Sequence, residues 1–520
     1  MNGKDEEGPA DPPEARGPFY RMFPLLALFS LIALVPRLLL ISWEFNPNGV
    51  DEGIQLMAGR MMSEGFSFYS EINTVQPPLM LSLYGILDIG PVGFRVLSSV
   101  LSIGILLMVM YLGYRLGGRM VMLTAGALLT ADIMFLQESR LASLDMFSLF
   151  FVVLSLLLFV LYRDRGNRLY LMFSGVCVGL ATMTKLYGAV AGAGILLVIL
   201  VDMAARSHKG EKGRVWRWLP PRDGRSAGIS DVLAFGAPLV LVVFVSTALF
   251  GMEEVFRGIV LNQLERPVDT LPARIWVFTK YLLVTPLSVF FFIFGVRRFW
   301  KKKEGVLLVV GGLYLLAFLI QAKTFTHHLI FLSPFLALGG GLGIMNLVER
   351  IGKNLRTKPK TSIYHRAPQA VALILACLVC AGFSVTVFAT GEPASRQLSN
   401  MVRDLTEEGD YIISGDPMIP ALAYRLTPPG IVNVATVQHP VLTDDDLNES
   451  LIDYGVRCVI LSHNLLDHEG FLQMVLDNFK LRAHFIGDTT PTDGEKEHFW
   501  LYTLDEEAAL LSHPEWGSEL

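Results

Sequence analysis

Charged residues are scarce in this chain. Only 18% of its 520 residues are Asp, Glu, Lys or Arg, whereas about 25% is usual for a soluble domain. Hydrophobic residues make up 52% of the chain, and the mean hydropathy is +0.47. This composition excludes an ordinary soluble enzyme and a disordered chain, and it predicts an integral membrane protein.

The chain also lacks an excess of basic residues and a set of paired cysteines. Its net charge of −5 supplies no basic surface for a phosphate backbone, which excludes nucleic acid as a partner. The four cysteines are too few and too scattered for a disulfide framework. Cys377 and Cys380 form a CxxC pair inside an apolar run, where we expect small packing residues rather than redox or metal chemistry.

Apolar runs divide most of the chain into predicted membrane spans. Residues 1–20 are polar, acidic and proline-rich and predict a disordered tail, so the first run is expected to be an uncleaved anchor. Several runs are shorter than the roughly 20 residues of a perpendicular span, so boundaries are expected to shift and one pair to be partly re-entrant. The eleven runs lie near residues 22–42, 91–113, 120–137, 145–161, 169–184, 187–203, 230–250, 275–296, 305–321, 329–347 and 369–389.

The distribution of Lys and Arg predicts the orientation. The even-numbered connections, for example 206–225 and 350–366, are rich in Lys and Arg, whereas the odd-numbered connections carry few. The positive-inside rule therefore places the even-numbered connections and the amino-terminal tail in the cytoplasm. An odd number of spans then places the carboxyl terminus outside the cell membrane.

Residues from about 390 onward change in character. Runs rich in strand-forming residues alternate with helical patterns, which predicts a small α/β domain outside the membrane. No GxGxxG motif follows a strand, so nothing indicates a dinucleotide site. The predicted organisation is a tail at 1–20, a transmembrane domain at 21–390 and an extracytoplasmic α/β domain at 391–520. The expected strands are Tyr411 to Ser414, Ile431 to Thr436, Arg457 to Ser462 and Phe499 to Leu504.

The first external connection, about residues 43–90, is long enough to indicate a functional loop. Asp51 and Glu52 begin a stretch with apolar residues at helical spacing, which predicts a short helix at the membrane interface. Helix capping and dipole stabilisation would also explain an acidic residue at this position. The other polar groups on the same side of the membrane favour a functional role.

The next two external connections add ionisable groups between strongly apolar runs. Such groups usually face a bundle interior or a water-filled cavity and mark function. In the second connection, Arg140 and Asp145 are candidates, with a mutual structural pair as the alternative. In the third, Lys185 is a candidate, and snorkelling to the lipid headgroups is its alternative.

The fifth external connection contains Lys323 and the adjacent His327 and His328. Two adjacent histidines cannot both face one metal from a regular helix, so we do not expect a zinc site that uses both. One of them can bind a metal or a phosphate oxygen, and a plain interfacial role is equally open.

The outer face thus combines carboxylates from two loops with cations from several others. A carboxylate can act as general base on an attacking hydroxyl, and fixed cations can stabilise a departing phosphate. Transfer from a lipid-linked phosphate needs this combination. A lipid tail would hold an activated sugar at the membrane, so no nucleotide-binding fold would be required.

In this order and topology, the motifs resemble those of GT-C-fold, polyprenyl-phosphate-sugar-dependent glycosyltransferases. This group includes the protein O-mannosyltransferases and the lipid A aminoarabinose transferase, and the outer domain is similar to tails on prokaryotic, notably archaeal, members. The resemblance covers roughly residues 30–345. The motifs are Asp51-Glu52-Gly53, Gln76-Pro77-Pro78-Leu79, Arg140 to Asp145, Thr184-Lys185 and Lys323 to His328 followed by Pro334.

The resemblance implies a many-helix core with an extracytoplasmic active site and an inverting transfer. Its essential loop-one aspartate falls on Asp51, with Glu52 beside it, and its second acidic position falls on Asp145. It also implies donor-phosphate contacts, and the candidates for these are Arg140, Lys185, Lys323 and His328. A divalent metal would be held by candidates among Asp51, Asp145 and His328. No WWD-type motif is present, which argues against an oligosaccharyltransferase catalytic subunit.

We therefore expect a multi-pass membrane glycosyltransferase that moves one sugar from a polyprenyl (dolichyl-type) phosphate to an external protein, lipid or glycan acceptor. Asp51 is expected to be the general base, and Glu52 and Asp145 are expected to orient the acceptor or hold a metal. The sugar, the acceptor and the oligomeric state stay open. The main alternative is a polytopic transporter or lipid flippase, which would suit many spans and buried charges. A non-catalytic scaffold would leave the acidic pair of loop one without a purpose.

Overall fold

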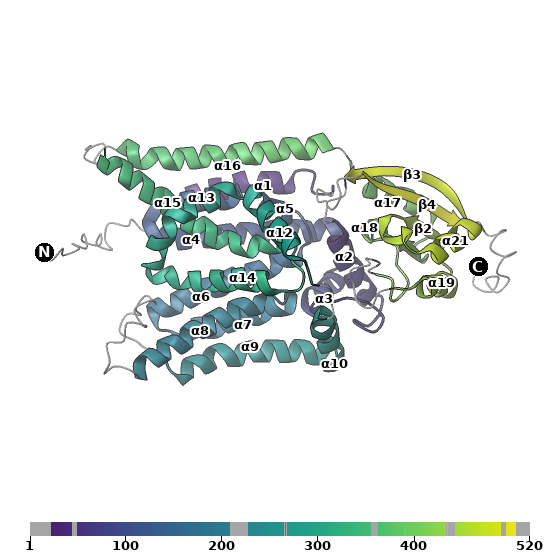
Figure 1. Cartoon of the computed structure of the whole chain (residues 1–520), viewed down its shortest axis with the longest axis horizontal. Coiled ribbons are helices and arrows are strands. Elements are labelled where there is room, and N and C mark those ends of the chain that lie inside the picture. Colours follow the sequence, from purple (N-terminus) through teal and green to yellow (C-terminus); the bar gives the residue numbers. More distant parts are fainter. Residues whose placement is uncertain are drawn as a thin grey trace.

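The computed structural model shows a long bundle of helices with a small sheet domain at one end (Figure 1). It describes residues 22–43, 49–207, 227–264, 266, 268–354, 362–390, 392–432, 434, 442–489 and 496–505. The predicted tail at 1–20 lies outside the described residues. Two short helices, α2 (Gly49–Ser63) and α3 (Pro78–Leu87), lie at the end of the bundle that carries the sheet domain (Figure 1).

The bundle is built from helices that run along its long axis and shorter helices at the end that carries the sheet domain (Figure 1). We call this end the outer end and the sheet domain the outer domain. Its first half contains α1 (Phe23–Leu38), α4 (Gly90–Thr130), α5 (Ile133–Glu138), α6 (Leu144–Arg165), α7 (Arg168–Thr184), α8 (Gly188–Ser207) and α9 (Ile229–Leu249). Its second half contains α10 (Met252–Phe256), η4 (Arg257–Leu261), α11 (Asn262–Leu264), α12 (Leu271–Val284), α13 (Pro286–Trp300), η5 (Lys303–Val306), α14 (Leu307–Ile320), η6 (Thr326–Leu332), α15 (Ser333–Asn354) and α16 (Ser362–Thr390).

The chain reverses direction inside α4. Gly117 and Gly118 leave the helical conformation, and Gly118 has a φ of 72°, which glycine adopts without steric cost. A Cβ on Gly126 would lie 2.9 Å from Cγ of Met110, although sixteen residues of straight helix would separate them by about 24 Å. The two predicted runs at 91–113 and 120–137 are therefore two helices joined by a tight turn.

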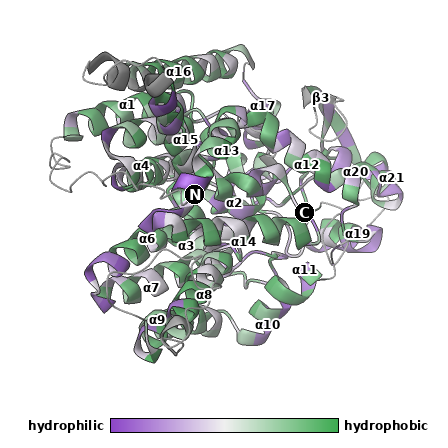
Figure 2. Cartoon of the chain, turned by 60° about the vertical axis from the view of Figure 1, so that its left-hand side comes forward, coloured by the Kyte–Doolittle hydropathy of each residue, from purple (hydrophilic) through white to green (hydrophobic). Residues whose placement is uncertain are grey.

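The helices have the length and hydropathy of membrane spans. Five described helices meet both criteria, and the number rises to seven if each of two bent helix pairs forms one span. Shorter apolar helices, such as α1 and α7, accompany them. In α9, large apolar residues including Leu233, Val240 and Phe244 are exposed on the protein surface, as expected for a helix that faces lipid. Figure 2 shows this apolar character along the helices of the bundle.

One predicted span is broken. The run expected at 275–296 forms α12 and α13, which meet at an angle of 90°. Pro286 starts the second helix, and a proline cannot donate the backbone hydrogen bond that would continue the first one. The bend separates α12, at the outer end of the bundle, from α13, which packs along α15.

The carboxyl-terminal residues form an α/β domain around a mixed four-stranded sheet of order β1-β2-β4-β3. β1 pairs in parallel with β2, and β4 pairs antiparallel with both β2 and β3. Leu398 and Val402 of α17 pack on one side of the sheet, while α19 and α21 contribute Leu447 and Phe471 to a second cluster. The strands are β1 (Ile412–Ser414), β2 (Cys458–Leu461), β3 (Phe479–Thr489) and β4 (Lys496–Leu504). The helices are α17 (Ala394–Leu405), α18 (Met418–Ala423), α19 (Asp444–Asp453), α20 (His463–Leu466) and α21 (Glu469–Asn478).

Three of the four expected strands correspond to β1, β2 and β4. The strand expected at Ile431 to Thr436 is wrong for the residues of that run that the structure describes, which form no strand. Its apolar residues serve packing instead, since Ile431 and Val434 are buried against the sheet domain. The longest strand, β3, was not predicted, although residues 479–485 alternate between apolar and polar side chains, which is the usual strand signal.

The outer domain is packed directly onto the helix that carries the loop-one acidic residues. Met418 and Ala421 of α18 belong to the same hydrophobic cluster as Ile54 and Met57 of α2. Gly53 makes this approach possible, since a Cβ there would lie 2.3 Å from the backbone nitrogen of Met418. The outer domain and the acidic helix therefore form one packed unit.

We predict that Gly53→Ala destabilises the protein by about 1–3 kcal/mol, because the added methyl group overpacks the contact with the Met418 backbone. Thermal unfolding in detergent measures the loss. The matched control is Gly236→Ala in α9, where nothing lies within 4 Å of the added Cβ and alanine favours the helix. Equal melting temperatures for Gly53→Ala and the wild type would show that the outer domain does not depend on this contact.

Candidate functional site

The first turn of α2 separates the two loop-one acidic residues. Neighbouring residues on an α-helix point about 100° apart, as its 3.6 residues per turn require. The Asp51 side chain is therefore 56% exposed, while the Glu52 side chain is 2% exposed. Both line a small pocket together with residues of the segment that leads into α6.

Glu52 has a complete set of partners within the protein. Its two oxygens accept hydrogen bonds from Nε and Nη2 of Arg95 at 2.7 and 2.8 Å. Oε1 also accepts the backbone N–H of Ala142 at 2.8 Å. Glu52 was expected to orient the acceptor or to hold a metal. In the structure, both of its oxygens take part in joining α2, α4 and the segment before α6.

The second acidic position, Asp145, lies in the first turn of α6. Lys185 follows α7, and its Nζ lies 2.5 Å from Oδ2 of Asp145, with both side chains almost fully buried. The ammonium group therefore lies in the protein interior. The alternative interpretation, in which Lys185 extends to the lipid headgroups, does not match this position. Oδ1 of Asp145 is buried and has no hydrogen-bond partner in the described structure.

Arg140 lies away from these carboxylates. Its guanidinium donates to the backbone oxygens of Pro36 and Leu40 near the end of α1, and it lies 5.8 Å from the ring centre of Phe383 in α16. The mutual pair with Asp145 that was considered does not form, because Lys185 takes that position. Lys323, also expected near the donor phosphate, lies 5.5 Å from the ring centre of Phe325 and does not line the pocket.

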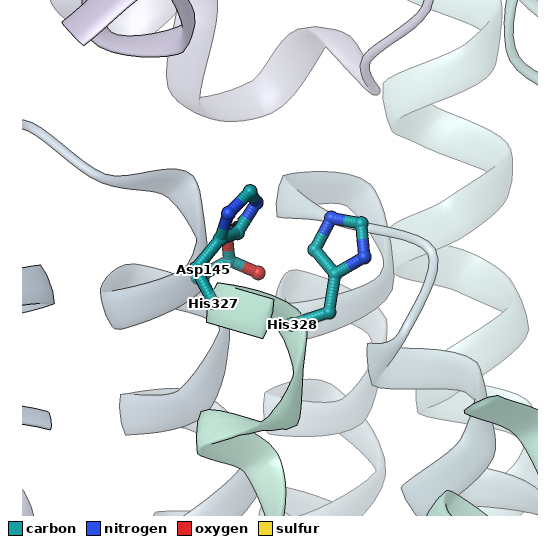
Figure 3. A group of neighbouring side chains, drawn as sticks. All are labelled: Asp145, His327 and His328. Carbon is teal, nitrogen blue, oxygen red and sulfur yellow. Dashed lines mark ion pairs between the residues drawn. The ribbon is translucent and has the colours of Figure 1, made fainter. Parts of the chain in front are cut away.

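The two histidines lie on η6, a 3₁₀ helix. Nε2 of His327 is 3.7 Å from Oδ2 of Asp51 and 3.8 Å from Oδ2 of Asp145. His328 points to the side, where its Nδ1 is 2.8 Å from the hydroxyl of Tyr187. Figure 3 shows the His327 ring over the Asp145 carboxylate and the His328 ring beside it.

Asp145, His327 and His328 form a possible metal site. Each offers one ligand atom, and these atoms lie within 4.8 Å of one another. The expectation that adjacent histidines cannot both face one metal assumed a regular α-helix, whereas these two histidines lie on a 3₁₀ helix. The tighter 3₁₀ turn places the two imidazole rings at 81° to each other with centres 4.4 Å apart.

Glu138 is a further acidic residue of the pocket that the sequence did not single out. Burial, and then the nearby Asp145, raises the pKa of Glu138 to about 8. Ser143 donates a hydrogen bond of 2.7 Å to its Oε2. Burial therefore favours the uncharged form of Glu138 beside Asp145.

The residues that the sequence analysis missed had a common signal. Arg95 and Glu138 are ionisable residues next to or inside apolar runs, where an unpaired charge is costly. A search for acidic partners of Arg95 that included the external connections would have considered Glu52. Tyr187, which contacts His328, and Arg266, which interacts electrostatically with Asp51, carried no such pairing signal.

Together, the bundle, its bent helices and the polar site at its outer end define the GT-C class of membrane-protein fold. Residues 87–222, about a quarter of the chain, match the family model described as dolichyl-phosphate-mannose-protein mannosyltransferase. No curated sequence matches the chain.

Solved structures match over nearly the whole chain. ArnT from Cupriavidus metallidurans in the apo state is 14% identical, with a TM-score of 0.64 over 93% of this chain and 98% of that one. The same protein bound to undecaprenyl phosphate gives 15% identity and a TM-score of 0.59, with the same coverage. The archaeal oligosaccharyltransferase AglB from Archaeoglobus fulgidus, in complex with an inhibitory peptide and a dolichol-phosphate, gives 14% and 0.55 over 94% of this chain and 74% of that one.

These similarities confirm the expected fold. The chain is a multi-pass membrane protein with a GT-C-type helical core and a small carboxyl-terminal sheet domain.

We predict that Glu52→Gln destabilises the protein by about 3–5 kcal/mol, because it leaves the buried Arg95 without its opposite charge. Thermal or denaturant unfolding in detergent measures the loss. The matched control is Glu253→Gln, which removes the exposed partner of Arg257 and should change stability by less than about 1 kcal/mol. A Glu52→Gln protein as stable as this control would disprove the structural role of the Glu52–Arg95 pair.

Proposed function

We propose that this protein is a membrane glycosyltransferase that transfers a single sugar from a polyprenyl phosphate to an acceptor outside the cytoplasm. The fold supports this proposal, since the solved structures that share it include complexes with undecaprenyl phosphate and dolichol-phosphate. The match of residues 87–222 to the mannosyltransferase family model agrees with it and makes a hexose such as mannose the first sugar to test.

The observation that carries the proposal is the contrast among the acidic groups of the pocket. Glu52 is bound to Arg95, and Asp145 is bound to Lys185. Asp51 is more than half exposed, so its carboxylate is accessible to an incoming hydroxyl group. A general base must reach the proton that it removes, and Asp51 meets this requirement better than its two acidic neighbours.

The proposed reaction is a single displacement. Asp51 accepts the proton of the acceptor hydroxyl, and the hydroxyl oxygen attacks the anomeric carbon of the sugar. The bond from that carbon to the phosphate oxygen breaks, and polyprenyl phosphate leaves with the bonding electron pair. Attack from the side opposite the phosphate inverts the configuration at the anomeric carbon.

Cationic and polar groups near Asp51 suit the donor phosphate. Lys185 is buried beside Asp145, and Arg266 interacts electrostatically with Asp51. His328 is the third candidate and is held by Tyr187. Fixed positive charge in a partly buried site stabilises the negative charge that develops on a leaving phosphate. We do not extend this role to Arg140 or Lys323, because their described contacts lie elsewhere.

In this proposal the site and the outer domain face the outside, and the Lys- and Arg-rich connections face the cytoplasm. The positive-inside rule supports this orientation. The transporter or flippase alternative receives less support, because the pocket that Asp51 lines involves α2, which lies at one end of the bundle (Figure 1). Substrate sites of secondary transporters lie near the middle of the bilayer.

We predict that Asp51→Asn lowers the turnover by about a hundredfold or more while the protein stays folded, because general-base catalysis typically contributes 10²–10⁴-fold. Release of polyprenyl phosphate from a panel of lipid-linked sugars, with membrane extract as acceptor, measures turnover. The control is Glu64→Gln, which follows α2 and is exposed. Turnover within about threefold of the wild type in folded Asp51→Asn protein would exclude Asp51 as the base.

A divalent metal is the second part of the proposal. Two imidazoles and one carboxylate form a donor set suited to ions such as Zn²⁺ or Mn²⁺. Asp145, His327 and His328 would hold the ion, which would supply positive charge next to the donor phosphate. The unpartnered Oδ1 of Asp145 fits this role. The Lys185 ammonium already contacts Oδ2, so Lys185 and a metal ion are competing cations at this carboxylate.

This competition predicts that Lys185→Met binds Zn²⁺ or Mn²⁺ about tenfold or more tightly than the wild type, because it removes a positive charge at contact distance. Isothermal titration calorimetry with each ion on metal-free protein in detergent measures the affinity. In the Lys185→Met background, His327→Ala should abolish the tight site. Tight binding that survives His327→Ala, or no binding by either protein, would contradict this metal site.

A further inference from the structure

A second cavity lies apart from the Asp51 pocket, between the membrane bundle and the outer domain. Its volume is about 660 Å³, which falls in the usual range for ligand sites of about 300–1,000 Å³. Three parts of the chain form its walls: the segment between α2 and α3, the α10–α11 region and the α19 side of the outer domain. We call this cavity the outer groove.

The walls of the outer groove are fixed to one another. The Tyr69 ring packs against η4 so closely that a Cβ on Gly258 would lie 2.2 Å from it. The backbone N–H of Gly430 donates to the oxygen of Glu71 at 2.6 Å, which joins the outer domain to the first wall. Gln263 donates to the Val75 oxygen at 3.3 Å. The groove is therefore already formed in the isolated protein.

Two of the three walls carry acidic residues. Glu253 and Glu254 come from α10, and Asp446, Glu449 and Asp453 come from α19. Among the described lining residues, Arg257 is the single cation, and it lies 3.2 Å from Glu253. Glu449 and Asp453 are one helical turn apart, a spacing at which like charges destabilise a helix. A cationic occupant would relieve this repulsion.

The arrangement of the carboxylates argues against a bound metal ion in the groove. Within the part of the chain that the structure describes, Asp145, His327 and His328 make up the one group of three residues close enough to share an ion. The carboxylates of the outer groove are spread over two walls instead. This spread suits positive charges spaced along an extended chain.

The remaining lining suits a polypeptide. Asn73 and Asn262 place side-chain amides at the groove, and such groups can both donate to and accept from a peptide backbone. The Tyr69 and Tyr454 side chains offer rings over which Lys or Arg can pack. Few large aliphatic side chains are present, so the groove offers little surface for a lipid tail.

We propose that the outer groove binds an extended segment of a polypeptide acceptor that carries Lys or Arg residues near its modified hydroxyl residue. The inference rests on the proposed transferase function and names the class of its acceptor. α2, which carries Asp51, and α10, which lines the groove, lie at the same end of the bundle (Figure 1), and the first wall continues directly from α2. Binding in the groove would hold the acceptor beside the catalytic pocket and leave the donor site to the lipid.

The test uses purified full-length protein in a non-ionic detergent and three fluorescent peptides. Each peptide has a central Ser, flanked on both sides by two Lys, two Gln or two Glu residues. Fluorescence anisotropy should show that the Lys peptide binds about tenfold more tightly than the Gln peptide, and that the Glu peptide binds most weakly. Raising the salt concentration from about 0.05 to 0.5 M should narrow this gap, because salt screens exposed charges.

The variant is the double substitution Glu449→Gln and Asp453→Asn, which removes two charges from one wall without changing side-chain size. It should weaken binding of the Lys peptide about fivefold or more and leave the Gln peptide within twofold. The matched control, Asp404→Asn with Glu408→Gln, removes two exposed charges from the outer domain outside the groove lining. Equal binding of the three peptides, or equal loss in variant and control, would overturn the proposal.

A parallel transfer assay separates this inference from the proposed function. If the protein releases polyprenyl phosphate from the donor in the presence of a lipid or glycan acceptor while none of the peptides binds, peptide binding in the groove is excluded and the proposed transferase function stands. If the Lys peptide binds through Glu449 and Asp453 but no donor gives Asp51-dependent transfer, the groove stands and the transferase fails.

Discussion

The buried ion pair between Glu52 and Arg95 is the constraint on which the candidate site depends. It joins α2 to α4, and the third hydrogen bond, from the Ala142 N–H, adds the segment that leads into α6. Two charges removed from water are costly unless their geometry and hydrogen bonding are nearly complete, so this arrangement holds the three elements in one geometry. Asp51, the preceding residue of the helix, is thereby held on the exposed side, in the same pocket as His327 and Asp145.

This constraint explains why two adjacent acidic residues lie in different environments. A helix turns by about 100° per residue, so one of two neighbours can be buried while the other faces a pocket. Glu52 supplies the attachment and Asp51 the accessible carboxylate. Asp145 and Lys185 form a second buried ion pair, between α6 and the residue that follows α7, and their charges balance in the protein interior. This pair keeps the Lys185 ammonium next to Asp145. In the proposed function, a metal ion at Asp145 would compete with this ammonium, whereas a donor phosphate would bind it.

The outer domain contributes to the site through packing and charge. Its α18 shares a hydrophobic cluster with α2, and the close contact of Gly53 with the Met418 backbone fixes the distance between them. Its α19 forms the acidic wall of the outer groove. A change at the outer domain can therefore reach α2 directly through this packing. The domain is thus structurally connected to the helix that carries Asp51.

The sequence by itself determined the class of the protein. Long apolar runs have few other stable environments than a lipid bilayer. The carboxylates and cations between these runs indicated the candidate site residues, which include Asp51, Asp145, Lys185 and the histidine pair. The β-branched and apolar runs of β1, β2 and β4 were also recognisable. Only the tertiary structure decided that Glu52 pairs with Arg95, that Arg140 contacts α1, that His327 lies nearest the carboxylates and that Lys185 neutralises Asp145. The physical reason is that charge identity is local, whereas the partner of a charge depends on which helices pack together and how each one is rotated about its axis.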